Sequence, residues 1–242
     1  MRPRDARNPA RLPRRSLLAV GATGLAAACL GWVDPNEGRE RAQAWARWNA
    51  EHDDAYALDD VVRWMSDGER PACARSAIVP YRGTSLRYAG AVFVNPAFAE
   101  RLARFETVVG AVARATYGRE PSRIRHYGAY NCRAVRTIHQ LLSEHALGNA
   151  IDVLGFDFGP AGKTTPLPPE LPKALKFPFE VRVLRHWGKT QGATAIHGRF
   201  LAALTERLVE RPDIFRSMFG PGHGGHDDHL HLDVSPWRWV DL

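Results

Sequence analysis

The sequence predicts an α+β fold: a single domain in which a largely antiparallel sheet is flanked by helices. Helix-like stretches come first along the chain, and strand-like stretches mixed with helices follow, which is the order expected of this class. Apolar residues make up 45% and charged residues 24% of the 242 residues, as in ordinary globular proteins. No apolar run reaches the length of about 18 residues that suggests a membrane span.

The first 28 residues have the composition of an export signal. Arg14 and Arg15 end a basic segment, a short apolar segment follows from Leu17, and three alanines ending at Ala28 suit signal-peptidase cleavage. The paired arginines also fit a twin-arginine signal, with an ordinary secretory signal as the alternative. We therefore expect an exported protein of the periplasm or cell envelope.

The strong positive charge belongs mostly to this leader. Residues 1–28 carry +5 of the net charge of +7, so the rest of the chain has little basic excess. Binding to nucleic acid needs a basic patch on the folded domain, and we expect no nucleic-acid partner.

The three cysteines fit an exported protein. Cys29 follows the alanines and resembles the lipidated cysteine of bacterial lipoproteins, which would attach the protein to a membrane. The alternative is cleavage after Ala28, which leaves a plain thiol. If Cys29 is lipidated or removed, Cys73 and Cys132 could form a disulfide in an oxidising compartment. Two separate buried thiols are the alternative for this pair.

Residues 29–70 are predicted to form a linker and N-terminal helices, and residues 71–242 the main domain. Helices are expected over residues 39–52 and 58–65, and a strand within residues 86–94. A longer helix should begin at Asn95-Pro96 and run to about Thr116, because proline is favoured in the first helical turn. Its apolar positions recur at helical spacing: Phe98, Leu102, Phe105, Val109 and Val112.

Strands and one further helix are expected in the second half of the chain. The predicted strands cover residues 124–130, 149–156, 180–187 and, as the last strand, 229–234. A proline-rich loop should cover residues 158–178, a helix residues 194–208, and a loop rich in glycine and histidine residues 219–228.

Two short stretches carry the candidate chemistry, residues 143–152 and residues 226–231. Alternate residues of a strand point to the same face, so His229 and His231 should project together while Leu230 and Leu232 enter the core. Asp152 should share its strand face with the small Ala150.

Together these stretches offer two imidazoles and one carboxylate with the spacing of a catalytic zinc site. Such sites hold zinc through three protein ligands and keep a further position for water. Gly148 allows a tight turn between His145 and Asp152. Asp227 and Asp228 could orient imidazoles or could be solvated loop acids. The alternatives for the whole cluster are a hydrogen-bonded histidine group and a structural metal site.

The motif Ser-x-His-x-x-Gly-x-Ala-x-Asp followed by His-x-His resembles that of the LAS-type zinc peptidases, a group that includes the hedgehog signalling domain. More closely, Tyr-Asn-Cys-Arg at residues 130–133, residues 142–153, and residues 220–222 with 226–233 resemble the bacterial extensin-like C-terminal domain family. The resemblance covers roughly residues 70–235.

The resemblance implies a LAS/hedgehog-like fold and a role for each motif residue. It implies that zinc is bound by His145, Asp152 and His231, and that His229 is the general base or orients the attacking water. By the same resemblance His226 stabilises the oxyanion or completes the outer shell of the metal, and Ser143 and Arg133 contact the substrate. For Arg133 the alternative is a structural ion pair with a nearby acid.

These expectations combine into an exported zinc peptidase that cleaves peptide bonds in the cross-links or stem peptides of peptidoglycan. Neither a Gly-x-Ser-x-Gly elbow nor a His-Glu-x-x-His motif is present, which disfavours a serine hydrolase and a metallopeptidase of the latter type. The alternative is a non-catalytic, metal-containing lipoprotein that binds the cell wall. We expect the protein to be a monomer.

Overall fold

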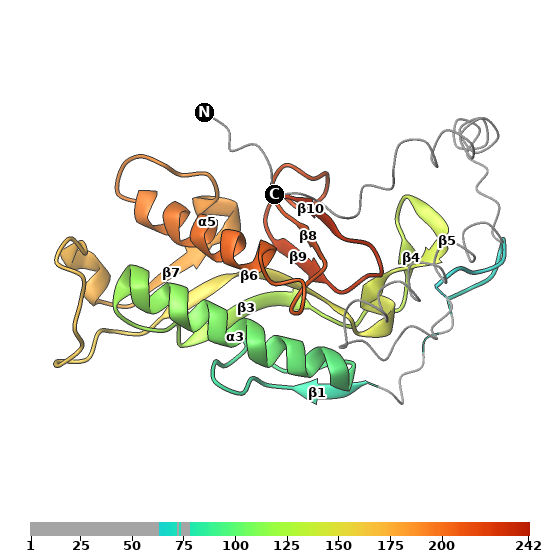
Figure 1. Ribbon diagram of the computed structural model, residues 1–242, viewed down its shortest axis with the longest axis horizontal. Helices are drawn as coiled ribbons and strands as arrows, with labels where there is room; N and C mark the ends of the chain where they lie inside the picture. The colour runs from blue at the N-terminus through green and yellow to red at the C-terminus, as the bar shows by residue number, and fades with distance from the viewer. Residues whose placement is uncertain (1–62, 72, 74–77) are drawn as a thin grey trace.

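The computed structural model describes residues 63–71, 73 and 78–242. It is a mixed α+β domain, as predicted, with two long helices beside one large sheet (Figure 1). Its helices are α3 (Pro96–Tyr117), α4 (Val183–His186) and α5 (Ala195–Val209), with short 3-10 helices η2 (Glu144–Leu147) and η3 (Lys173–Lys176). Its strands are β1 (Val79–Tyr81), β2 (Val92–Val94), β3 (Arg123–Gly128), β4 (Ala134–Val135), β5 (Ile138–Leu142), β6 (Ala150–Phe158), β7 (Phe179–Arg182), β8 (Ser217–Phe219), β9 (Leu230–Asp233) and β10 (Trp239–Asp241).

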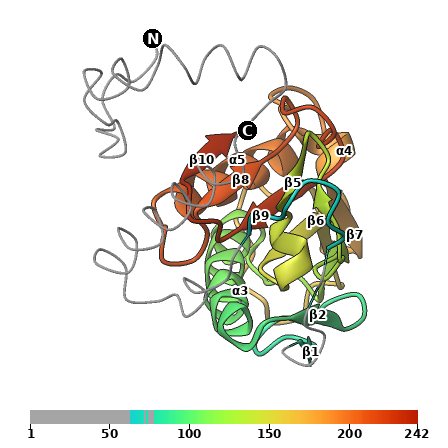
Figure 2. The same cartoon turned by 90° about the vertical axis from the view of Figure 1, so that its right-hand side faces the viewer.

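The main sheet has six strands in the order β10-β8-β9-β6-β3, and β7 also pairs with β6. Every pairing in it is antiparallel except that of β10 with β8, which confirms the largely antiparallel sheet. Strands β1 and β2 form one separate hairpin, and β4 and β5 form another. Figure 2 shows the β1–β2 hairpin at one end of α3.

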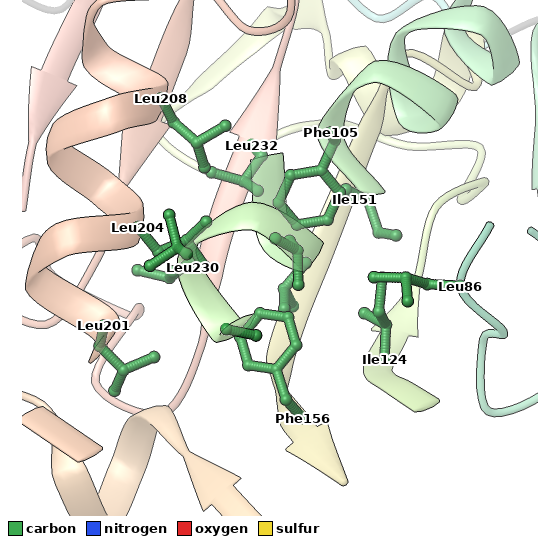
Figure 3. Close-up of a cluster of buried hydrophobic side chains, with 14 of the residues drawn as sticks. Leu86, Phe105, Ile124, Ile151, Phe156, Leu201, Leu204, Leu208, Leu230 and Leu232 are labelled. Atoms are coloured by element: carbon green, nitrogen blue, oxygen red, sulfur yellow. The ribbon is translucent and has the colours of Figure 1, made fainter. Parts of the chain in front are cut away.

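One face of the sheet carries the hydrophobic core. Helices α3 and α5 contact each other and belong with the sheet to one core cluster. Figure 3 shows Ile151 of β6 and Leu230 and Leu232 of β9 pointing into this cluster, toward Phe105 of α3 and Leu204 of α5. Because alternate strand residues point to opposite faces, residues 152 and 231 lie on the face away from the core.

Strand β6 changes its inward-facing set at Gly155. Ile151 and Val153 are buried in the core before it, and Phe156 and Phe158 after it, so the alternation shifts by one residue. The register with β3 shifts at the same place, and Gly155 has a φ of 150°. A Cβ there would lie 2.0 Å from the carbonyl oxygen of Val181, so only glycine fits this bulge.

The predicted long helix is confirmed almost to the residue as α3. Asn95 caps it by accepting a hydrogen bond from the Ala97 backbone N–H at 2.9 Å, and Pro96 fills the first position. Gly118 ends it in the left-handed conformation, with a φ of 71°. The predicted helix over residues 194–208 is likewise present as α5, and the proline-rich loop contains only η3.

Three of the predicted elements are wrong in part. The strand expected over residues 180–187 ends at Arg182, and α4 follows, where the Arg182 backbone N–H donates to His186 Nδ1 at 2.9 Å. Strand β9 is not the last strand, because β10 pairs with β8 beyond it. The helix expected over residues 58–65 does not extend through residues 63–65, which are extended beside β5.

This extended segment gains its backbone partners from β5. The Met65 N–H donates to Gln140 O and the Leu142 N–H donates to Arg63 O, both at 2.7 Å. Tertiary pairing of this kind overrides a local helical pattern. The Arg63 side chain then forms a buried ion pair with Glu144, in which Nε lies 2.6 Å from Oε1. Glu144 precedes His145, so the pair supports the backbone of η2.

We expect Arg63→Met to lower the free energy of unfolding by about 3–5 kcal/mol, because it leaves the Glu144 carboxylate buried without its partner. The double variant Arg63→Met, Glu144→Gln removes that stranded charge and should lose less. Urea unfolding with the disulfide intact measures both. A single variant within about 1 kcal/mol of the wild type would contradict this reading of the pair.

A second buried cluster, on the core side, predicts a dependence of stability on pH. His197 of α5 forms a hydrogen bond through Nδ1 with the Tyr117 hydroxyl, 2.9 Å away, and its ring centroid lies 4.7 Å from that of His186. Burial, with a smaller contribution from His186, lowers the pKa of His197 to about 4. As the pH falls, this histidine therefore takes up its proton in the unfolded chain, near its ordinary pKa of about 6.5, before it does so in the folded protein.

The stability gained from neutral His197 should be complete above about pH 6.5 and lost as the pH falls towards about 4, by at most about 3 kcal/mol. His197→Gln keeps a hydrogen-bonding group beside Tyr117 but does not titrate, so it should flatten this part of the profile. His139→Gln changes an exposed histidine of β5 and serves as the control. Equal slopes for wild type and His197→Gln in denaturant melts from pH 7 to 4 would refute the assignment.

No helix among the described residues is long and apolar enough to cross a membrane. The predicted export signal, Cys29 and the predicted helix over residues 39–52 lie outside the described residues.

Candidate metal centre

Three side chains from different elements meet on the open face of the sheet. His145 comes from η2, Asp152 from β6 and His231 from β9. His145 Nε2 lies 3.1 Å from His231 Nδ1 and 3.2 Å from Asp152 Oδ1, and the last two atoms are 2.9 Å apart. Both imidazoles are buried, while the Asp152 side chain keeps 20% of its surface exposed.

The sheet register and a short turn bring these residues together. Asp152 is the direct cross-strand partner of His231 in the β6–β9 pair. Between His145 and Asp152, Gly148 takes the left-handed conformation with a φ of 67° and ends η2. A Cβ on Gly148 would lie 2.8 Å from the backbone nitrogen of Asn95, so the predicted need for glycine at this turn is confirmed.

Ser143 holds the start of η2. Its side-chain oxygen accepts a hydrogen bond from the His145 backbone N–H at 3.3 Å, and the residue is buried. Ser143 therefore helps to position the backbone of His145, a candidate metal ligand. Its predicted contact with substrate stays a prediction.

Hydrogen bonds on the outer side of each imidazole fix which nitrogen carries the proton. His145 Nδ1 lies 2.6 Å from Ala129 O, and His231 Nε2 lies 2.9 Å from Asp233 Oδ2. A carbonyl or carboxylate oxygen only accepts, so these nitrogens donate, and in the neutral rings the lone pairs of His145 Nε2 and His231 Nδ1 face the centre. Metal-bound histidines commonly show such outer partners.

Asp233 was missed by the sequence analysis. It lies two residues after His231 in β9, and its other oxygen accepts a hydrogen bond from the Ser235 backbone N–H at 2.8 Å. Both carboxylate oxygens are therefore engaged and the side chain is fixed. An acid two residues from a candidate ligand in the same strand was the available signal, since the two side chains share a face.

The electrostatics of the centre favour an ionised carboxylate. Burial alone would raise the pKa of Asp152, but the hydrogen bonds from His145 and His231 outweigh it and hold this pKa far below its usual range. For His231, burial acts to lower the pKa, and the bonds to Asp152 and Asp233 outweigh it and raise the pKa to about 9. Without a metal ion, the two acids thus favour the protonated imidazole of His231, and a cation at the centre would take the place of the proton on Nδ1.

The donor set fits zinc. Zinc prefers imidazole and carboxylate ligands about 2.0–2.2 Å away in a tetrahedron, which places neighbouring donor atoms about 3.3 Å apart. The three measured separations, from 2.9 to 3.2 Å, are close to this value. Within the described part of the chain, no other group of histidine, cysteine or acidic residues meets the geometric requirement for a metal ion.

His229 lies beside the three donor atoms, and Asp228 fixes the orientation of its ring. Its Nδ1 lies 2.8 Å from Asp228 Oδ1, and the other oxygen of Asp228 accepts a hydrogen bond from the Tyr127 hydroxyl. Asp228 therefore orients this imidazole, as in the first of the two alternatives stated for it, and is not simply a solvated loop acid. Nε2 of His229 then carries a lone pair and lies 3.6 Å from Asp152 Oδ1. Asp227 is exposed, as expected of a solvated acid.

His226 belongs to an aromatic group next to the donors. Its ring centroid lies 4.9 Å from that of His229 and 5.7 Å from that of His231, while Phe219 stacks on His231 at 5.6 Å. Burial, followed by the neighbouring His231 and His229, lowers the pKa of His226. The structure thus places both predicted histidines of the last motif against the candidate ligands.

The cysteine pair is a disulfide between Cys73 and Cys132, with Cα atoms 5.8 Å apart. This outcome confirms the prediction and excludes two separate thiols. A cross-link that closes a loop of this length contributes about 4 kcal/mol in the chain-entropy account. Arg133 follows Cys132 directly and has no acidic partner among the described residues, so the predicted structural ion pair is not found there.

Asp233→Asn should weaken zinc binding about 10–100-fold, because the outer partner fixes the orientation and basicity of His231. Asp227→Asn removes an equal charge from a nearby exposed position and should leave the affinity unchanged. A competition titration with a coloured chelator compares the variants. Equal affinities for both would show that Asp233 does not act on the ligand.

The fold and the donor set define a mixed α+β protein with a candidate metal centre. Residues 59–166 match the family described as extensin-like protein C-terminus, which supports the resemblance to that family. The match covers a little under half of the chain and includes Arg133, Ser143, His145 and Asp152, but ends before the last histidine motif. No curated protein and no solved structure gives a significant match.

Proposed function

We propose that this protein is an exported, zinc-dependent hydrolase of peptide bonds and that its substrate is peptidoglycan. One observation carries the proposal: one nitrogen from each of two imidazoles and one carboxylate oxygen converge at tetrahedral-edge distances, with a third, separately oriented imidazole beside them. The resemblance to LAS-type zinc peptidases suggests the same donor set and a related fold.

The proposed metal ligands are His145 Nε2, Asp152 Oδ1 and His231 Nδ1. When bound at such a set, zinc lowers the pKa of a coordinated water and polarises a carbonyl group. The outer contacts with Ala129 and Asp233 keep the two imidazoles in the tautomers that ligation needs. The partial exposure of Asp152 leaves the centre open to a substrate.

His229 is the proposed general base. Its Nδ1–H donates to Asp228, which leaves the Nε2 lone pair to take a proton from the attacking water. The same nitrogen then returns the proton to the amine as the C–N bond breaks. Asp228 stabilises the imidazolium form in between, and Tyr127 in turn holds Asp228.

For His226 the geometry favours a supporting role over donation to an oxyanion. Its Nδ1 lies 3.2 Å from Gly224 O, and since a carbonyl only accepts, this nitrogen carries the proton of the neutral ring. Nε2 of the neutral ring can therefore accept but not donate. We propose that His226 packs against His229 and His231 and excludes water from their edges.

Peptidoglycan is the proposed substrate because the expected export would bring the protein to the cell wall, and because of the resemblance to LAS-type zinc peptidases. The proposal is tested by incubating purified sacculi with zinc-loaded protein and separating the released muropeptides by mass spectrometry. We expect new amino and carboxyl ends, loss of the activity with a chelator and its return with zinc. Stoichiometric zinc and retention on sacculi, with an unchanged muropeptide profile, would favour a non-catalytic wall-binding protein instead.

A further inference from the structure

All lysines of the sequence are exposed and lie within one short stretch of the chain. They are Lys163, Lys173, Lys176 and Lys189. The segment that holds them, residues 159–192, has six basic and two acidic side chains and so carries +4. Residues 29–242 carry only +2, because +5 of the total of +7 belongs to the leader. Positive charge is therefore concentrated in this segment.

The lysines lie at the end of the domain that is farthest from the candidate metal centre. Strand β6 starts beside the centre, and the loop with the first three lysines follows its last residue, Phe158. From Asp152 to Phe158 the strand advances about 20 Å, at about 3.3 Å per residue. Figure 1 shows the β4–β5 hairpin at one end of the molecule, and the loop before β7 and the loop before α5, which carries Lys189, at the other.

Residues 172–178, here called the lysine ridge, combine lysines with apolar side chains. Of these seven residues only Leu175 is buried. The exposed ones are Pro172, Lys173, Ala174, Lys176, Phe177 and Pro178. Phe177 is 69% exposed, the largest fraction among the large apolar side chains that the structure describes. A lone exposed apolar residue is ordinary, but this one lies in a row of apolar and basic neighbours, which is typical of a binding surface.

The backbone of the lysine ridge is fixed by the rest of the domain. Nη2 of Arg119 donates to Leu175 O at 2.6 Å and to Phe177 O at 3.3 Å. The Ala161 N–H donates to Lys176 O at 2.8 Å, and Leu175 belongs to the main core cluster. The ridge therefore presents its exposed side chains on an ordered backbone, so that binding through it requires little further ordering.

The lysine charges are available to an outside anion. None of the four lysines forms an ion pair with another described residue, whereas Arg182 and Arg185 in the same segment both pair with Glu180. A lysine side chain can lay its apolar stem along a surface while its ammonium group reaches a polar layer.

We propose that the lysine ridge docks on a membrane that contains anionic phospholipids. Phe177 inserts among the lipids, and the lysines contact the headgroup phosphates. An acidic polymer of the cell wall would match the charge but would offer no apolar phase to Phe177, so the membrane is the better fit. Docking in this way holds the candidate metal centre about 20 Å above the bilayer, the length of β6 beyond Asp152. The inference is independent of the proposed hydrolase activity.

Sedimentation with vesicles tests the proposal. The protein is the chain left by the expected cleavage, residues 29–242, with Cys29→Ser, because the leader or an attached lipid would bind vesicles by itself. Vesicles of equal parts phosphatidylglycerol and phosphatidylcholine are compared with vesicles of phosphatidylcholine alone. We expect binding to the anionic vesicles only, and weaker binding as sodium chloride is added, because salt screens the charges.

A double variant tests the lysines. Lys173→Gln with Lys176→Gln should weaken binding to the anionic vesicles roughly 25-fold, because each basic residue at such a surface contributes about fivefold. The matched control is Arg207→Gln with Arg238→Gln. It removes the same charge at the far end of α5, where Arg207 is exposed and Arg238 bonds Val209 O, and should change the affinity little.

A second pair of variants tests insertion of the ring. Phe177→Ser should weaken binding roughly tenfold or more, because the variant has no large apolar side chain to transfer out of water. Phe93→Ser changes an exposed phenylalanine of β2 and should bind as the wild type does. All substituted side chains are exposed, so circular dichroism spectra should match that of the wild type.

Three results would overturn the proposal. One is retention on sacculi that the lysine variant loses, without binding to vesicles, which would assign the ridge to an acidic wall polymer. Another is equal weakening by the lysine and arginine double variants, which would show a general effect of charge. The third is unchanged binding of Phe177→Ser, which would exclude insertion. Hydrolysis of muropeptides by the same samples reports separately on the proposed function.

Discussion

His231→Ala is expected to abolish both zinc binding and peptide hydrolysis. The substitution removes one of three donors and leaves the carboxylates of Asp152 and Asp233 facing a gap that the imidazole filled. The loss of affinity should exceed the range of about 10–100-fold that follows from changing an outer partner. Metal content measured by mass spectrometry after purification without added zinc, together with muropeptide release, gives both results.

His223→Ala is the matched control, because His223 lies in the loop of residues 220–228 but forms its hydrogen bond with Asp241 at the sheet edge and not with the centre. It should keep one zinc per chain and most of the activity. His145→Ala and Asp152→Ala should behave as His231→Ala does. Full zinc occupancy in any of these three ligand variants would show that the donor set has been assigned wrongly.

His229→Ala is expected to keep zinc and lose turnover, by about 10²–10⁴-fold in kcat, the range for a general base. The separation of the two effects follows from the structure, where His229 Nε2 lies 3.6 Å from Asp152 and outside the closer group of three donors. Steady-state hydrolysis of a synthetic stem peptide, with the zinc content of the same sample, measures the prediction.

Asp228→Asn should fall between wild type and His229→Ala, because it keeps the imidazole and weakens its orientation. Tyr127→Phe, which removes only the hydroxyl that holds Asp228, should have the smallest effect. Unchanged turnover in His229→Ala, or loss of zinc along with turnover, would exclude His229 as the base.

The candidate centre was predicted from the spacing of two motifs and from a family resemblance, and strand alternation predicted which side chains of the last motif face it. The alternation of Leu230, His231 and Leu232 predicts which side chains enter the core and which face the site, and the structure agrees. Gly148 was predictable for the same kind of reason, since a left-handed turn favours glycine. Helix α3 was predictable from its cap residues and its apolar spacing.

The parts that were missed depend on contacts between distant segments. The pairing of residues 63–65 with β5, and of β10 with β8, requires partners that no local pattern specifies. The two-residue strand β4 is too short to show an alternation. The phase shift at Gly155 also needs the neighbouring β7 backbone to explain it.

Anomalous X-ray scattering at the zinc absorption edge, from crystals of protein purified without added metal, tests the central claim most directly. We predict one strong peak about 2.0–2.2 Å from His145 Nε2, a carboxylate oxygen of Asp152 and His231 Nδ1. A water or substrate oxygen should complete the tetrahedron, with His229 close to it but unbound. The account would be contradicted by crystals without such a peak, or by a peak held by other residues.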